Sequence, residues 1–319
     1  MKQRTYGCII NPAAGQGYPE THLEYIKGNV KKYAPDTDIR LTKEQGHGAE
    51  IAKEFIKQGI DTILVAGGDG TVNEVGSVLI SYPNTTLGVI SGGTGNDYNY
   101  AAGFPDRFQE RDWETLFAHN TAKVDVGVCN GHYFFNGMGI GFDAAMSAES
   151  QADRIRTGTS GKGRYTWIIL KTLFGYKEHK RTVTSPSGTK EEQAFMTTIA
   201  LGRRFAGTYL LTPYALTDDG LLDICNILPI SIPKRLQILL KVPKGTHIFD
   251  RKVKYGTCKS CLFEFENRVP AHLDGELIYD YRFDISIRKH ALNLIIDPQN
   301  AAVCANLPIS GRKLGILPV

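Results

Sequence analysis

The stretch Gly67-Gly68-Asp69-Gly70-Thr71 decides the fold because of what stands on either side of it. The apolar run Thr62 to Ala66 before it predicts a buried strand, and the run Val72 to Ile80 after it has the pattern of a helix. Strand, glycine loop and helix in this order are typical of a parallel sheet with crossover helices. The loop would then lie at the carboxyl edge of the sheet, where the first helical turn presents unpaired N–H groups to an anion.

Two more small-residue loops follow predicted strands in the first third of the chain. Asn11 to Gly15 follows the strand Tyr6 to Ile10, and Ser91 to Asp97 follows the strand Thr86 to Ile90. The carboxyl ends of parallel strands meet at one edge of a sheet. Together with the central loop, these stretches predict a crevice that binds a polyphosphate. The sequence lacks a Walker A motif, so a P-loop NTPase is not indicated.

The carboxylate of Asp69 would repel phosphates unless a cation or a proton transfer intervened. Its place in the central loop therefore indicates a metal-assisted or acid–base role, and Mg²⁺ is the expected ion because it is hard and shares phosphate ligands. The alternative is a tight strand-to-helix turn in which Asp69 caps the helix.

The pattern of the chain changes after about Val124, where short strand-like segments separated by Gly, Asn and Pro replace the long helical patterns. This change predicts an α/β domain over residues 1–125 and a mostly antiparallel β domain over 126–296. Residues 297–319 form a tail that could return to the first domain. The clearest strand patterns of the second domain are at 126–130, 133–136, 197–201, 222–228, 262–266 and 282–288, and helical patterns stand at 165–173 and 234–242.

The composition of the 319 residues is that of an ordinary globular protein, with 42% hydrophobic and 22% charged residues. A net charge of +4 does not indicate a nucleic-acid partner. The apolar run Cys8 to Ile10 near the start is far too short for a signal peptide or a membrane span. Scattered cysteines in a chain of this size are typical of reduced thiols, so we expect a cytoplasmic protein.

The glycine loops and several later blocks resemble the diacylglycerol-kinase catalytic domain shared by bacterial lipid kinases, sphingosine kinases and ceramide kinases. The matching blocks occur in order over nearly the whole chain. They are Asn11-Pro12, Gly67 to Val75, Gly93 to Asp97, Asn136 to Ala144, Pro213 to Ala215, Asp219 to Asp223 and Asp274-Gly275-Glu276.

The resemblance implies an N-terminal doubly wound α/β domain of the NAD-kinase and diacylglycerol-kinase type, followed by a C-terminal β-sandwich domain. It implies ATP in the cleft between them and a kinase that phosphorylates a lipid hydroxyl. The positions carried over to nucleotide binding are Asn11, Pro12, Ala13, Ala14, Gly15, Thr42, Gly67, Gly68, Asp69, Gly70, Thr71, Val72, Asn73, Glu74, Gly93, Thr94, Asn96 and Asp97.

Asp274 and Glu276 are the candidates for accepting the hydroxyl proton, and Asp69 is the third acidic candidate for catalysis. Two residues apart, the first two carboxylates share one side of an extended segment, and like charges held close raise one pKa. Similar enzymes use this Asp-Gly-Glu as the base-bearing element. We favour Glu276 narrowly, with Asp274 orienting it or binding metal through water. A solvated turn is the alternative.

Two Mg²⁺ positions are expected. Asp69, Asp97 and Asp125 are candidates for the ion bound to the nucleotide. The resemblance maps a second ion to the carboxylate of Asp219 and the backbone carbonyls of Leu216 and Leu221, an oxygen-only ligand set that suits Mg²⁺ or Ca²⁺. The alternative for this second position is an ordinary Asp-Gly hairpin turn.

A lipid acceptor requires peripheral, transient contact with a membrane surface. The apolar run Leu236 to Val242, flanked by Lys234, Arg235, Lys241 and Lys244, could lie on an anionic bilayer. The alternative is a helix that covers the sandwich core. Arg203 and Arg204 could pair with an anionic headgroup or face solvent. The sequence leaves a homodimer open.

Two other functions remain open. A NAD kinase also carries a Gly-Gly-Asp-Gly loop, although the Asn-Pro loop and the late Asp-Gly-Glu fit lipid kinases better. A catalytically silent nucleotide or lipid sensor is the other alternative, against which the retained Asp69, Asp97, Asp274 and Glu276 argue.

Overall fold

The computed structural model describes residues 4–157 and 162–303. Its first half contains the elements β1 (Tyr6–Ile10), η1 (Ala14–Gln16), α1 (Tyr18–Thr21), α2 (Leu23–Tyr33), β2 (Asp38–Leu41), α3 (His47–Lys57), β3 (Thr62–Gly67), α4 (Asp69–Leu79), β4 (Thr86–Ser91), α5 (Asp97–Ala101), α6 (Glu110–Ala118), β5 (Thr121–Cys129), β6 (His132–Phe134) and β7 (Gly137–Gly141). The remainder consists of α7 (Phe142–Thr157), α8 (Lys162–Gly175), β8 (Lys180–Ser185), β9 (Gly188–Gln193), β10 (Met196–Ala200), β11 (Leu222–Ile227), α9 (Ile232–Lys241), η2 (Val242–Lys244), η3 (Thr246–Phe249), β12 (Val253–Cys258), β13 (Ser260–Leu273) and β14 (Glu276–Ile295).

The first domain is a parallel sheet with helices on it, as the sequence predicts. Its strands run in the order β2-β1-β3-β4, and all four are paired in parallel. Every residue of β3 and β4 is buried, which is typical of parallel strands covered on both faces. The helix α3 packs on this sheet with Ile51, Ala52 and Phe55 buried.

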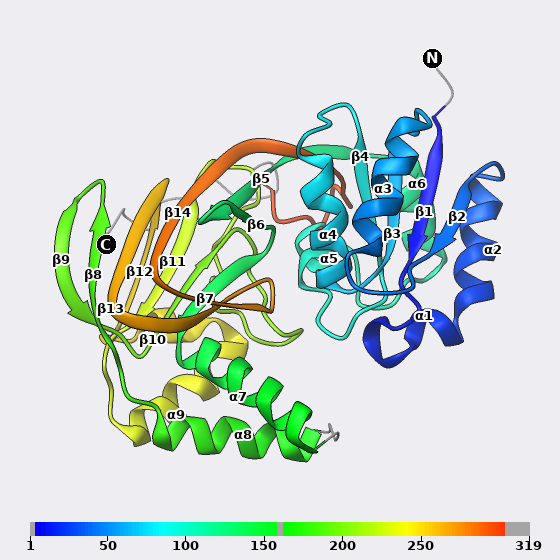
Figure 1. Ribbon diagram of the computed structural model, residues 1–319. Helices are drawn as coiled ribbons and strands as arrows, with labels where there is room; N and C mark the ends of the chain where they lie inside the picture. The colour runs from blue at the N-terminus through cyan, green and yellow to red at the C-terminus, as the bar shows by residue number, and fades with distance from the viewer. Residues whose placement is uncertain (1–3, 158–161, 304–319) are drawn as a thin grey trace.

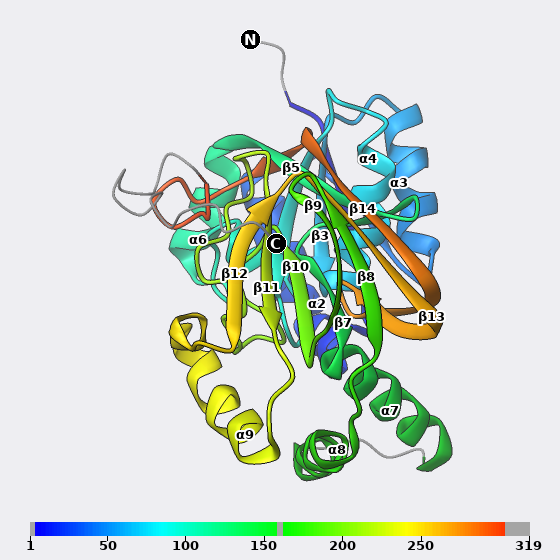
Figure 2. The same ribbon diagram turned by 90° about the vertical axis from the view of Figure 1, so that its left-hand side faces the viewer.

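The second domain has two cores, one on each face of the sheet β12-β11-β10-β7-β13. Met138, Ile140 and Ile199 face the core between the sandwich layers, whereas their neighbours Met196 and Ala200 face a core completed by α7, α8 and α9. This alternation is the period of a strand. Figure 2 shows the three helices together at the lower end of these strands. The predicted α/β plus β architecture is confirmed.

The strand β14 runs through both domains, arching from one to the other in Figure 1. Its first part pairs with β13, and its end pairs in parallel with β4, at Asn293 and Leu294. Leu292, Leu294 and Ile295 belong to the core of the first domain. The predicted limit at 296 therefore assigns to the second domain three residues that belong to the core of the first.

The tail also contacts the first domain. Asp297 N donates to Ala102 O, and Val303 lies in the first core. Residues 304–319, the rest of the predicted tail, lie outside the described residues.

A bulge marks the passage of β14 between the domains. The register of β14 against β5 shifts between Arg288 and Leu292, and His290 has a φ of 52°. Asp125 of β5 holds this bulge, because its Oδ1 accepts from His290 N at 2.7 Å and its Oδ2 from Gly220 N at 2.6 Å. The predicted boundary at 125/126 falls at this crossing. In the described part of the chain, no helix combines the length and hydropathy needed to span a bilayer.

Candidate active site

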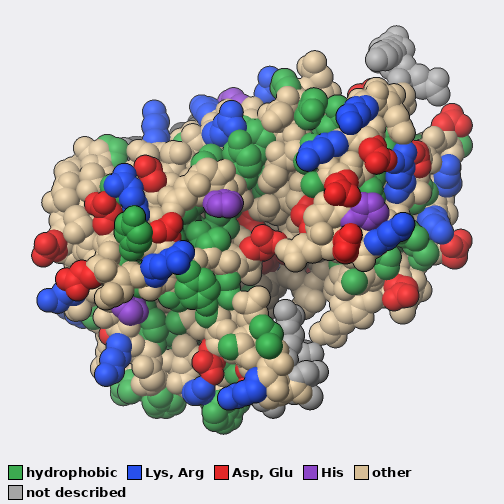
Figure 3. Space-filling view, in the orientation of Figure 1, with side chains coloured by type: hydrophobic (Ala, Val, Ile, Leu, Met, Phe, Trp, Pro, Cys, Tyr) green, Lys and Arg blue, Asp and Glu red, His purple; other side chains and the backbone are tan. Residues whose placement is uncertain are grey.

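A cavity of about 550 Å³ opens at the carboxyl edge of the parallel sheet. Figure 3 shows a hollow between the two domains with acidic side chains at its rim. Most of the lining was predicted from the glycine loops, and the second domain contributes Glu276. The lining comprises Asn11, Pro12, Ala13, Ala14, Gly15, Glu20, Thr42, Lys43, Glu44, Gln45, Gly68, Gly70, Thr71, Glu74, Gly93, Thr94 and Glu276.

Four of these lining residues, Glu20, Lys43, Glu44 and Gln45, were not predicted from the sequence. Lys43 to Gln45 follow Thr42 directly, so the position of Thr42 at a strand end was the available signal. No comparable pattern marks Glu20, which lies in the short helix α1.

The three loops contact one another at glycine residues, and at these contacts there is no room for a side chain. A Cβ on Gly93 would lie 2.5 Å from Gly68 Cα, and one on Gly15 would collide with Gly92 O. Gly15 also has a φ of 54°, which favours glycine. The loops can approach one another and a phosphate only without Cβ atoms, so these positions build the cradle that a triphosphate requires.

Hydrogen bonds of side chains hold the loops in place. Asn11 Nδ2 donates to Thr71 Oγ1 at 2.8 Å, which leaves the Thr71 hydroxyl hydrogen able to point elsewhere. Glu74 accepts from Gly46 N at 2.8 Å and Gly48 N at 3.2 Å, and thereby fixes the start of α3.

Two of the residues predicted to contact the nucleotide, Asn96 and Val72, have side chains that contact other parts of the protein. Asn96 Oδ1 accepts from Gly93 N at 2.7 Å and closes the Gly93–Asn96 loop, with its backbone at a φ of 52°. Val72 is buried in the first core, so it has only its backbone to offer a ligand.

The carboxylates of Asp69 and Asp97 converge over Gly95. A Cβ on Gly95 would lie 3.1 Å from Asp69 Oδ2 and 3.3 Å from Asp97 Oδ2. Their other oxygens accept backbone hydrogen bonds, from Tyr98 N to Asp69 and from Gly207 N to Asp97. Burial raises the pKa of Asp97 to about 7, and the charge of Asp69 acts in the same direction. Two like-charged carboxylates that both lie beside Gly95 would hold a divalent cation more readily than they tolerate each other.

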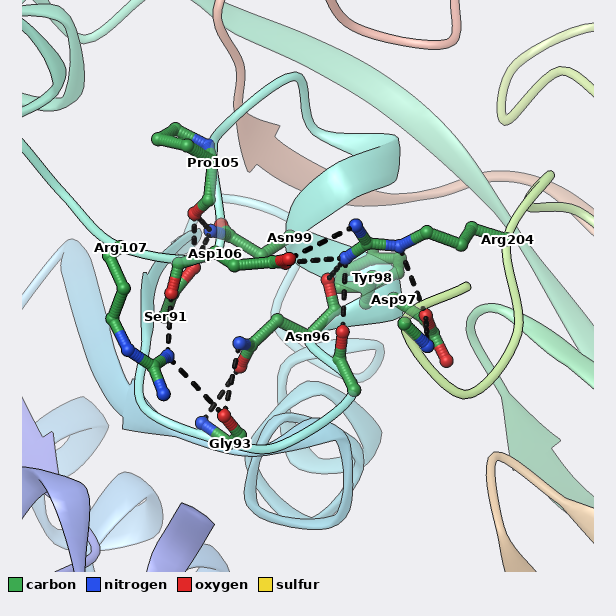
Figure 4. Close-up of polar contacts among 12 residues, drawn as sticks. Ser91, Gly93, Asn96, Asp97, Tyr98, Asn99, Pro105, Asp106, Arg107 and Arg204 are labelled. Atoms are coloured by element: carbon green, nitrogen blue, oxygen red, sulfur yellow. Dashed lines mark hydrogen bonds and ion pairs between the residues drawn. The ribbon is translucent and has the colours of Figure 1, made fainter. Parts of the chain in front are cut away.

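The buried Arg204 clamps the fourth-strand loop from the second domain, as Figure 4 shows. Its Nε donates to Asp97 Oδ1 at 3.2 Å, and its Nη2 donates to Asp106 Oδ1 at 2.6 Å and to the carbonyl oxygens of Gly95 and Asn96. Arg203 Nε donates to Ala215 O at 2.9 Å. The expectation that this pair meets a headgroup is therefore wrong for Arg204, whose donors are used within the protein.

Asp274 is enclosed by donors, whereas Glu276 is exposed to the cavity. Asp274 Oδ1 accepts from the backbone N–H groups of Asn136 and Gly137, and its Oδ2 accepts from Phe135 N and Asn73 Nδ2, all between 2.7 and 3.0 Å. Burial raises the pKa of Asp274, and these hydrogen bonds oppose the shift. Glu276 lines the cavity, where Gln45 Nε2 stands 3.5 Å from its Oε1.

The remaining metal candidates lie in a separate turn. Asp219 Oδ1 accepts from Leu221 N at 2.9 Å, and burial, together with the charges of Asp125 and Asp218, raises the pKa of Asp219 to about 6. A cation held there by Asp219 and the carbonyls of Leu216 and Leu221 would relieve this repulsion. Asp125 of β5 uses both oxygens within the protein, because its Oδ1 accepts from His290 N in the bulge of β14 and its Oδ2 accepts from Gly220 N in this turn. The described residues contain no cluster of three or more His, Cys, Asp or Glu side chains suited to a metal.

This fold and site define a two-domain kinase with a glycine-lined phosphate cradle. Residues 5–129 match the diacylglycerol kinase catalytic domain, and residues 136–296 match the YegS C-terminal NAD kinase beta sandwich-like domain. The chain belongs to the diacylglycerol-kinase family of lipid kinases, and it is an enzyme that transfers a phosphoryl group to an alcohol acceptor.

Curated relatives and a solved structure agree with this assignment over almost the full length. A "Probable lipid kinase YegS-like" from Chromohalobacter salexigens is 28% identical, with 93% of this chain and 94% of the relative covered. Another from Shewanella frigidimarina is 26% identical, with 93% and 100% covered. The crystal structure of a diacylglycerol kinase from Bacillus anthracis str. Sterne is 25% identical, has a TM-score of 0.72 and covers 93% of this chain and 98% of that one.

Proposed function

We propose that this enzyme uses ATP and Mg²⁺ to phosphorylate the hydroxyl of a diacylglycerol-like or related lipid at a membrane surface. The single observation that carries the proposal is the pairing of two different cavities. One is polar and lined by the glycine loops, and the other is an almost wholly apolar cavity of about 90 Å³ in the second domain. A phosphate donor suits the first, and part of an acyl chain suits the second.

Bound ATP would supply the phosphoryl group, and Mg²⁺ would shield its charge. Gly68 and Gly70, at the N-terminus of α4, line the polar cavity and would hold the phosphates through their N–H groups. Asp69 and Asp97 would hold the ion. Among the carboxylates that line this cavity, Glu276 is the one that the second domain contributes, so we assign to it the removal of the hydroxyl proton. Asp274 would position the segment that carries Glu276.

The apolar cavity lies between the sheet and the helices α7, α8 and α9. Its floor is formed by Met196 and Ile227, and its walls include Leu173 and Ile238. Burying an acyl chain in such surroundings gains about 0.8 kcal/mol per methylene. A NAD kinase has no use for an apolar cavity of this kind, which favours a lipid acceptor.

The surface next to this cavity supports membrane contact. Trp167, Leu170 and Phe174 stand at helical spacing on α8 and are 61%, 41% and 56% exposed, and Leu240 on α9 is 80% exposed. Figure 3 shows hydrophobic side chains together with Lys and Arg along the lower edge, where these helices lie. An apolar face with cationic neighbours suits an anionic bilayer.

The run 236–242 was expected either to lie on a bilayer or to cover the sandwich core, and it has features of both. Ile238 and Val242 are buried in the core, whereas Leu236 and Leu240 are exposed. Arg235 is buried and donates to Leu173 O at 2.6 Å and Glu178 Oε1 at 2.7 Å, so it is not available to lipid headgroups.

An acceptor panel tests the proposal. The purified protein is given ATP, Mg²⁺ and, in turn, diacylglycerol, monoacylglycerol, a sphingoid base, ceramide, phosphatidylglycerol and NAD, and the products are weighed by mass spectrometry. A phosphorylated lipid is expected. Phosphorylation of NAD alone would establish the rival function, and ATP binding without any product would indicate the silent sensor.

A further inference from the structure

A buried histidine–aspartate pair lies beside the apolar cavity, with Asp143 among the lining residues and His272 behind it. His272 Nε2 and Asp143 Oδ2 are 3.2 Å apart, and both residues are 9% exposed. Asp143 belongs to the first turn of α7 and lines the cavity, whereas His272 lies on β13. Gly139 makes the contact sterically feasible, because a Cβ there would collide with the Asp143 carboxylate and lie 2.5 Å from His272 Nε2.

The pair leaves one nitrogen of His272 unused. When Asp143 accepts a hydrogen from Nε2 of an unprotonated ring, the other nitrogen, Nδ1, is a hydrogen-bond acceptor. This Nδ1 atom is buried and has no hydrogen-bond partner among the described residues. A buried polar atom without a partner is costly and rare in folded proteins, so it indicates a partner from outside the chain, which is a water molecule or a ligand.

The position of the pair on the sheet relates it to both halves of the site. His272 pairs with Gly139, and Gly139 pairs with Thr198, so these residues share one cross-strand row. Gly141 and Met196 form the next row toward the apolar cavity. In the other direction along β13, two residues on, Asp274 contacts the nucleotide domain through Asn73.

A step of two residues along a strand is about 7 Å. The row of His272 therefore lies between the interdomain contact and the cavity for the chain, on the face that α7, α8 and α9 cover. Glu276, the proposed base in the nucleotide cavity, is four residues beyond His272 in the chain. A lipid whose reacting hydroxyl reached Glu276 would place a different part of its head beside His272.

We propose that His272 Nδ1 accepts a hydrogen bond from a second donor on the lipid, distinct from the hydroxyl that is phosphorylated. This inference rests on the proposed function and narrows its substrate class. The preferred acceptor carries an additional hydroxyl or an amide N–H near the chain, as a monoacylglycerol or an N-acylated amino alcohol does. A diacylglycerol, whose only donor is the reacting hydroxyl, is the poorer substrate.

A matched pair of lipids tests this inference. One is 1-monooleoylglycerol, and the other is its 2-O-methyl ether, which keeps the reacting hydroxyl and the chain but lacks the second donor. For the wild type, kcat/KM should be at least about tenfold higher for the free diol, because a buried acceptor left unpaired penalises the ether. Equal values for the two lipids would overturn the proposal.

Variants locate the effect. His272→Leu should bring the diol down to the level of the ether, whereas His272→Gln, which retains an acceptor oxygen, should preserve part of the preference. Met196→Leu, an apolar exchange in the same cavity, should change both lipids equally. Persistence of the full preference in His272→Leu would contradict the assignment.

Equilibrium binding keeps the test independent of turnover and of the variants' folding. Wild-type protein is titrated with each lipid in detergent micelles, without ATP. Tighter binding of the diol supports a hydrogen bond from the lipid to His272, even if no lipid is phosphorylated. Absence of phosphorylation would contradict only the proposed kinase activity. Equal binding of the diol and the ether, with a lipid still phosphorylated, would contradict only the role of His272.

Discussion

Asn73 of α4 donates a hydrogen bond to Asp274 of the second domain, with 2.9 Å between its Nδ2 and the Asp274 Oδ2. This bond joins the helix that opens the phosphate cradle to the segment that carries Glu276. Because the other donors to Asp274 come from the backbone of Phe135 to Gly137, the carboxylate is fixed in place. The bond from Asn73 therefore links the phosphate cradle to the position of the proposed base.

Removing this link should slow turnover more than it weakens nucleotide binding. Asn73→Ala should lower kcat by about 10- to 100-fold, because small misplacement of reacting groups costs that much, while KM for ATP stays within a few-fold. Steady-state kinetics with varied ATP provide the measurement. Ser77→Ala is the control, since Ser77 contacts Asn73 Oδ1 at 3.3 Å without touching Asp274. A kcat unchanged in Asn73→Ala would show that the interdomain bond does not position the base.

Glu276→Gln should lower kcat by about 10²- to 10⁴-fold, since it removes the proposed proton acceptor. ATP affinity should remain nearly intact, because the change is isosteric. Single-turnover kinetics and nucleotide titration separate the two effects. If the variant kept full activity, the proton would have to go to another group.

Arg204→Met should destabilise the protein by about 3 to 5 kcal/mol, because it leaves the buried Asp97 without its charged partner. Denaturant unfolding gives the free energy. Arg203→Met is the matched control, since Arg203 donates to the backbone oxygen of Ala215, and its loss should cost about 1 kcal/mol. Similar small losses in both variants would mean that the clamp on the Gly95–Asp97 loop contributes little.

Leu173→Trp should fill the apolar cavity and exclude an acyl chain. We expect kcat/KM for a long-chain acceptor to fall at least about tenfold, with ATP binding unchanged. Leu170→Trp places the same side chain on the exposed face of α8, where Leu170 is 41% exposed. It should leave activity near that of the wild type, because it keeps the proposed membrane-contact face apolar. A fully active Leu173→Trp variant would place the chain elsewhere.

The pKa of Asp97, raised to about 7 by burial and by Asp69, predicts how stability changes with pH. Between roughly pH 4 and pH 7 the folded state holds a proton on Asp97 that the unfolded state has released, so the free energy of unfolding decreases as pH rises. Asp97→Asn should reduce this decrease by at least about 1 kcal/mol. Urea unfolding of both proteins across this range gives the comparison. An identical pH dependence in the two would show that Asp97 titrates normally.

The sequence predicts the parts of this molecule that local chemistry determines. Strand ends followed by glycine loops specify the cradle, because parallel strands deliver their loops to one edge. The sandwich follows from the change in strand pattern after Val124. These inferences need only neighbouring residues.

The contacts between the domains depend on residues far apart in the chain and leave no local signal. Arg204 reaches Asp97 across 107 positions, and Asp143 meets His272 across 129. β14 reads as a strand only near residues 282–288, although it continues into the first domain. Such pairings become visible once both partners are placed by the packing of whole sheets.

The most direct measurement follows the transfer of the labelled γ-phosphate of ATP to a lipid. The protein is incubated with γ-³²P-labelled ATP, Mg²⁺ and vesicles that contain mono- and diacylglycerol, and the mixture is extracted with organic solvent. Label in the organic phase for the wild type, and its absence for Glu276→Gln, is the predicted result. Label that remains entirely in the aqueous phase, as inorganic phosphate or a phosphorylated dinucleotide, would contradict a lipid acceptor.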